Sequence, residues 1–168
     1  MSRRDGFTLV ECLVAIVLFA VIILAIAPLF WTGVRADAAG LDYSTVARLS
    51  RDKLEHLMNE PITAAELLVP AGQTTASFGN DLPARVDPVT GAPSTNARYP
   101  LYPYTRTWTV ELFHINADNS MTAVVSGAPY QVKRVTVSVA SARTGLPGLR
   151  RVAVTALLNN PDPEANRL

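Results

Sequence analysis

The residues best placed to do chemistry lie near the N-terminus, where one carboxylate interrupts a long apolar run. Glu11 is the only charged residue between Gly6 and Val34. A charge at the centre of a bilayer costs about 2.5–3.5 kcal/mol and less near the interface, so such a residue usually has a partner. Cleavage after Gly6 would create an amine at Phe7, about one helical turn from Glu11. In a bundle of like helices, the amine of one subunit would neutralise the carboxylate of another and fix the axial register.

Other candidate sites are weaker. His56 and Glu60 have the i,i+4 spacing of metal ligands, but two ligands are too few, and His114 stands near a turn. Asp81 and Asp118 do not form a cluster with the spacing of a calcium loop. The sequence contains no nucleophile elbow, phosphate loop or zinc-protease helix motif. We therefore expect no enzymatic activity, no cofactor and no metal.

The apolar run around Glu11 has the length and flanks of a membrane span. All but three of the residues from Phe7 to Trp31 are apolar, and Cys12–Trp31 alone would span about 30 Å as a helix, which matches a bilayer core. Arg3 and Arg4 precede the run, so the positive-inside bias keeps them cytoplasmic and the remainder is exported. The run is longer than the apolar region of a signal peptide, about 7–15 residues. We expect a single-pass anchor over residues 7–31.

The helix is expected to continue beyond the membrane as an amphipathic segment, residues 34–60, ended by Pro61. A helix over 7–60 would be roughly 80 Å long. Pro28, Gly33 and Gly40 are the points where it could bend. The apolar residues at helical spacing, which we expect to face the rest of the protein, are Tyr43, Val46, Ala47, Leu54, Leu57 and Met58.

Residues 61–168 have the composition of a small globular head. Seven of the twelve prolines lie in residues 61–104, which predicts a long irregular loop with a short helix near Ala64–Leu68. Apolar residues then alternate over 105–158, which predicts an antiparallel β-meander of three or four strands with a turn at 144–148. Residues 159–168 are expected to be a loose tail. The expected fold class is α+β, with one long helix packed on a small antiparallel sheet.

The segment Gly6-Phe7-Thr8-Leu9-Val10-Glu11, followed by the apolar run, resembles the class III leader of type IV pilins and pseudopilins. The resemblance implies that residues 1–6 are a leader and that a prepilin peptidase cuts after Gly6 and methylates Phe7. It also implies that Glu11 pairs with a neighbour's N-terminal amine during assembly, and that Pro28 kinks the helix.

The helix end, Ala47–Glu55, and the final hairpin resemble PilV-like minor pilins and the I-type pseudopilins of type II secretion. The large insert at 61–104 favours a PilV-like minor pilin that enters a type IV pilus or primes its assembly. A pseudopilin of type II secretion or DNA uptake is one alternative, and a membrane-anchored extracytoplasmic binding module is another.

The expected location is the bacterial inner membrane with the head in the periplasm, and later the pilus. The resemblance implies three kinds of partner: major and minor pilins through the N-terminal helix, the prepilin peptidase, and an inner-membrane assembly platform. The net charge of +1 and the lack of a basic block give no footprint for nucleic acid.

Overall fold

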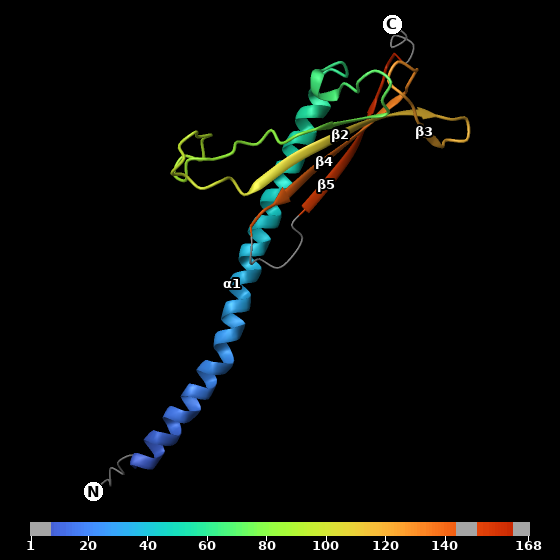
Figure 1. The fold of residues 1–168 in the computed structure, drawn as a ribbon. Helices are drawn as coiled ribbons and strands as arrows, with labels where there is room; N and C mark the ends of the chain where they lie inside the picture. The colour runs from blue at the N-terminus through green and yellow to red at the C-terminus, as the bar shows by residue number, and fades with distance from the viewer. Residues whose placement is uncertain (1–7, 144–150, 163–168) are drawn as a thin grey trace.

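The computed structural model describes residues 8–143 and 151–162. It contains one long helix followed by a 3-10 turn and an antiparallel sheet, which confirms the α+β prediction (Figure 1). The leader at 1–6, the turn predicted at 144–148 and residues 163–168 of the predicted tail lie outside the described residues. The prediction of a loose tail is wrong at its start, because Asn159 belongs to β5 and the buried Asn160 side chain donates to the Tyr130 carbonyl at 2.9 Å. The elements are α1 (Leu9–Asn59), η1 (Ala65–Leu67), β1 (Thr75–Phe78), β2 (Tyr104–Ile115), β3 (Met121–Ala123), β4 (Val132–Ser141) and β5 (Arg151–Asn159).

The 51 residues of α1 form a continuous helix. It begins after the N-cap residue Thr8, and it ends where Glu60 turns to an extended conformation before Pro61. Pro28 has no N–H, so the carbonyl of Leu24 lacks its usual donor, yet the helix continues through this position. Figure 1 shows α1 as a gently curved rod whose lower half extends well away from the sheet.

One face of the upper half of α1 packs against the sheet. Its buried residues are Asp42, Val46, Leu49, Ser50, Lys53 and Leu57. The prediction that Tyr43 and Met58 face the head is wrong, since these side chains are 48% and 51% exposed. The buried stripe is rotated from the most apolar stripe because it includes charged residues that find partners in the head.

The sheet has the strand order β1-β2-β4-β5, all antiparallel, and β3 pairs with the end of β2. Its inner face forms the core with fully buried Val110, Val135, Val137 and Val139. The expectation that residues 61–104 lack strands is wrong, because β1 pairs with β2 from Thr75↔Glu111 to Phe78↔Trp108. The expected short helix is present as η1.

Residues 79–103, which we call the arm, project from the β1–β2 side of the head (Figure 1). The arm has its own hydrogen bonds: Arg85 donates to the Tyr99 carbonyl, and Asp87 Oδ1 accepts from the N–H of Val89 at 2.7 Å and of Thr90 at 3.2 Å. Val89 is 91% exposed. The arm is therefore a structured projection that exposes an apolar side chain.

Candidate functional site

Glu11 forms a capping box with Thr8 at the start of α1. The Thr8 N–H and hydroxyl donate to Glu11 Oε2 at 2.9 and 3.0 Å, and the Glu11 N–H donates to Thr8 Oγ1 at 3.3 Å. This reciprocal pattern satisfies two of the backbone donors that every helix start leaves without partners. The sequence Thr-x-x-Glu is the signature of such a box, so α1 starts where the sequence dictates.

The capping box leaves half of the carboxylate available. None of the described residues bonds Glu11 Oε1, and the side chain is exposed. Gly6 and Phe7, the predicted sites of cleavage and methylation, lie outside the described residues. Cleavage before Phe7 would leave the Thr8 N–H an ordinary amide, so the box is compatible with a shortened chain. Glu11 can therefore cap its own helix and accept a cation at the same time.

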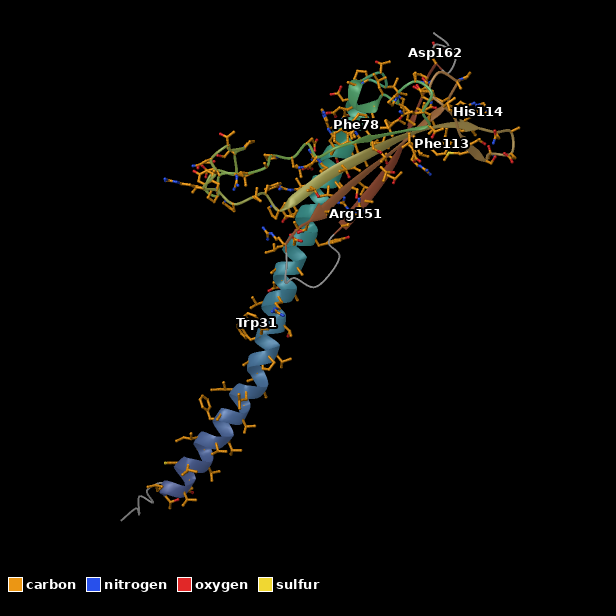
Figure 2. The ribbon with its side chains drawn as sticks, viewed as in Figure 1. Trp31, Phe78, Phe113, His114, Arg151 and Asp162 are labelled. Atoms are coloured by element: carbon orange, nitrogen blue, oxygen red, sulfur yellow. The ribbon has the colours of Figure 1, made fainter. Side chains whose placement is uncertain are left out.

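The lower part of α1 has no cover from its own chain. Among the described residues, α1 is the only helix long and apolar enough to cross a membrane, and residues 8–37 are exposed throughout. Trp31, labelled in Figure 2, lies on this bare part of the helix, and the Arg35 guanidinium stands 4.9 Å from its ring centroid. An aromatic ring followed by a cation is typical of the interfacial end of a membrane segment.

Asp42 is the lowest polar attachment between α1 and the sheet. Its buried Oδ1 accepts from the Tyr104 hydroxyl at 2.9 Å and from the Ser141 hydroxyl at 3.1 Å, and Arg143 Nε lies 3.6 Å away. Burial raises the pKa of the Tyr104 hydroxyl, and the hydrogen bond to Asp42 raises it further. This one carboxylate therefore joins α1 to the start of β2 and the end of β4.

Lys53 is a second attachment, three turns further along the same face. Its ammonium, 4% exposed, lies 2.6 Å from Glu66 and 3.1 Å from Asp81, and 4.0 Å from the centroid of the Trp108 ring. Arg106 binds Asp81 with both Nε and Nη2, at 2.7 and 2.8 Å. Burial would raise the pKa of Asp81, but the hydrogen bonds from Arg106 and Lys53 outweigh it and hold the pKa below its usual value.

Lys133 is a third attachment, just beyond the end of α1. It lies on the inner face of β4 and is 3% exposed, and its ammonium donates to the carbonyls of Ile62 at 2.6 Å and Leu67 at 2.8 Å. Burial lowers the pKa of Lys133 to about 8. The ammonium thus fixes the chain around η1 to the sheet.

Sequence reasoning missed all three attachments, because charged residues on a helix or a strand are normally assigned to the solvent face. The available signal was spacing: Asp42, Val46, Leu49, Lys53 and Leu57 follow one another at intervals of three or four residues, which places them on one face. The partners of Asp42 lie 62 or more residues away in the sequence, so no local pattern identifies them.

The weaker candidate sites do not converge. His56 Nε2 lies 3.8 Å from both Glu60 and Glu66, whereas His114 lies at the far end of β2, next to β3 (Figure 2). Asp118 Oδ1 is occupied by the N–H and hydroxyl of Ser120. Within residues 8–143 and 151–162, no group of three or more potential metal ligands is found.

Comparison with known protein families gives a match at the N-terminus. Residues 1–27 match the prokaryotic N-terminal methylation motif. This prepilin-type motif supports a type IV pilin-like family, whose role is structural rather than enzymatic, and it indicates a prepilin-peptidase substrate of the pilin or pseudopilin kind. It also indicates membrane anchoring and a pilus-assembly context. No curated protein and no solved structure matches the chain.

Proposed function

We propose that this chain is a minor type IV pilin of the PilV-like kind. It is inserted in the inner membrane through residues 7–31, cleaved after Gly6, and methylated at Phe7. It then enters a pilus or the complex that primes one. Its head faces the periplasm before assembly. The chain is processed by an enzyme rather than acting as one.

The observation that carries this proposal is the unequal cover of α1. The upper half packs on its own head, while the lower half exposes a continuous apolar surface with a single carboxylate near its start. Such a surface requires a host that excludes water. A bilayer is the first host, and a bundle of similar helices from other pilins is the second. In that bundle Glu11 Oε1 accepts the amine of a neighbouring subunit.

The arm supports the assignment to a minor subunit. It adds a structured projection to one side of the head (Figure 1), and the Val89 side chain within it is exposed. A subunit that repeats along a shaft would carry this projection at every step, whereas a subunit present in few copies can reserve it for a particular neighbour. The Ala47–Glu55 resemblance supports the same group of proteins.

Mass spectrometry of the mature N-terminus tests the proposal directly. The full chain, recovered from cells that carry the prepilin peptidase, should begin at Phe7 and bear one additional methyl group. Cells that lack the peptidase provide the control and should retain Met1. A chain that keeps Met1 in the presence of the peptidase, or that is cut near Ala27, contradicts the proposal.

Sheared filaments then separate a pilin from a pseudopilin. A minor pilin should appear in the sheared pilus fraction, and its deletion should reduce piliation. A chain absent from that fraction, whose deletion blocks protein secretion or DNA uptake and leaves piliation unchanged, is a pseudopilin instead.

A further inference from the structure

We infer that the free edge of β5 is a strand-addition site, which binds an extended strand from a neighbouring pilin-like subunit of a different sequence. The site consists of the backbone groups of Ala153, Thr155 and Leu157. These groups are available because alternate residues of β5 bond β4, and the residues between them direct their N–H and C=O groups away from the sheet.

In the antiparallel pairing of β4 with β5, the numbers of opposite residues sum to 291, as for Val132↔Asn159 and Ala140↔Arg151. The Asn160 N–H donates to the Gln131 carbonyl at 2.7 Å in this register, which makes the even-numbered residues of β5 those that bond β4. The other side of β4 agrees, because the Ala142 N–H donates to the Pro103 carbonyl at 2.7 Å, so even-numbered residues of β4 bond β2. Odd-numbered residues of β5 therefore direct their N–H and C=O groups away from the sheet.

The outward backbone groups of Ala153, Thr155 and Leu157 have no partner among residues 8–143 and 151–162. Natural sheets protect an open edge with prolines, inward-pointing charges, bulges or very short strands. β5 runs for nine residues in unbroken register with β4, without proline, glycine or lysine, and its only charge is at Arg151. An edge of this kind is suited to accept another strand.

The side chains at this edge also lack full cover. On the inner face, Val137 and Val139 of β4 are fully buried, but their partners Val154 and Val152 on β5 are only half-buried. A strand added beyond β5 would extend the inner face by one row and cover these two side chains. The partner segment is therefore extended and uncharged, with apolar residues at alternate positions.

A second copy of this chain does not fit the edge. Antiparallel pairing of β5 with itself requires a twofold axis perpendicular to the sheet, which reverses α1 because α1 lies along the sheet face (Figure 1). Two copies anchored in one membrane cannot point in opposite directions. Pairing of β5 with the opposite edge of a second copy offers only four residues of β1 and three of β3, beside the arm. A different chain, with its helix parallel to α1, satisfies both constraints.

This inference rests on the proposed function for the orientation of the partner. It is tested with two proline variants of the full chain, Thr155→Pro and Ala153→Pro, which remove outward N–H groups and leave the bonds to β4 in place. The matched control is Thr155→Val, which keeps the N–H and, like Thr155→Pro, loses the hydroxyl contact with Thr136. Val154→Pro removes a backbone hydrogen bond to β4 and is the control for a head that does not fold.

Both outward proline variants should be cleaved like the natural chain, but their amount in the pilus fraction should fall by at least about tenfold, the ratio that 1.4 kcal/mol of lost binding produces. Thr155→Val should be incorporated normally. Normal incorporation of Thr155→Pro overturns the inference. Failure of cleavage in the natural chain overturns the proposed function instead, so the two outcomes are distinguishable.

Hydrogen exchange of the natural chain provides a readout that does not depend on a variant folding. In the detergent-solubilised protein, the amides of Val154 and Ala156 should exchange slowly and those of Thr155 and Leu157 quickly. In filaments, Thr155 and Leu157 should become protected by at least about tenfold. Unchanged exchange at these two amides overturns the inference, as does a cross-link from position 157 to a second copy of this chain.

Discussion

At the scale of single residues, the Glu11 carboxylate caps its own helix, and we propose that it also pairs with a neighbour's amine. Its Oε2 accepts from Thr8, and no described residue bonds its Oε1. The position of Glu11 in the apolar run predicted the amine pairing, whereas the capping box was not predicted, although the sequence carries its Thr-x-x-Glu signature. The two roles have different chemical requirements, because a cap needs an acceptor and amine pairing needs a negative charge.

Glu11→Gln separates these roles. Glutamine retains an oxygen for the capping box but carries no charge. The variant should insert and be cleaved normally, and its amount in the pilus fraction should fall by at least about tenfold, as for Glu11→Ala. Immunoblots of sheared filaments measure this directly. Normal incorporation of Glu11→Gln, with loss only for Glu11→Ala, would show that the cap rather than the charge matters.

Lys133 makes the stability of the head depend on pH. Its pKa in the folded protein is about 8, below the value of 10.5 that it takes in an unfolded chain. Between these values the unfolded chain binds more protons, so stability rises as the pH increases. Relative to Lys133→Met, the free energy of unfolding of the natural protein should rise by up to about 3 kcal/mol between pH 8 and 10.5.

Urea titrations in detergent, followed by tryptophan fluorescence, measure this difference, and the other ionisable groups cancel between the two chains. A difference that stays constant from pH 7 to 10 would contradict the lowered pKa of Lys133. In that case the two carbonyls of Ile62 and Leu67 would compensate for the burial of the charge.

At the scale of elements, the sequence predicted those parts of the fold that follow a regular local period. The alternation in β4 and β5 identified their inward residues correctly, and Pro61 marked the end of α1. β1 was missed because its four residues are too short to show a period among prolines, and its position depends on the stacking of Phe78 on Trp108, 30 residues away, at 5.1 Å. The buried face of α1 was missed because Asp42 and Lys53 depend on distant partners.

The Asp42–Tyr104 contact should contribute measurably to the attachment of α1. Tyr104→Phe removes a buried hydrogen bond to a carboxylate and should lower the free energy of unfolding by about 1.5–3 kcal/mol. Combined with Asp42→Ala, the two losses should be less than additive, since both remove the same contact. Tyr102→Phe is the control and should have little effect, because no described residue bonds the Tyr102 hydroxyl and its ring contacts with Tyr104 are retained. Additive losses in the double variant would contradict a direct coupling.

At the scale of the whole molecule, the chain divides between a part that needs a host and a part that supplies its own core. Every described core residue lies at or beyond Val46, and residues 8–37 are exposed. The sequence predicted this division from hydropathy. It did not predict that the arm lies on the β1–β2 side of the sheet and the open edge on the β5 side, because both positions depend on the strand order.

A chain that begins at Arg35 should therefore fold as a soluble head. It keeps all of the described core and the three polar attachments, and every described residue that it loses is exposed. Gel filtration should show a monomer, and circular dichroism should show cooperative unfolding. Aggregation or a non-cooperative transition would mean that the lower helix contributes to the stability of the head.

The spacing of the polar attachments along α1 has a mechanical consequence. Asp42 and Lys53 hold the head at two heights on the helix, three turns apart, and Lys133 holds the chain just beyond the helix end. Tension applied along α1, against a head held by its neighbours, loads these contacts in shear at the same time. The contacts must then yield together rather than peel apart one by one. The head is thus joined to its helix in the geometry that best resists a lengthwise pull.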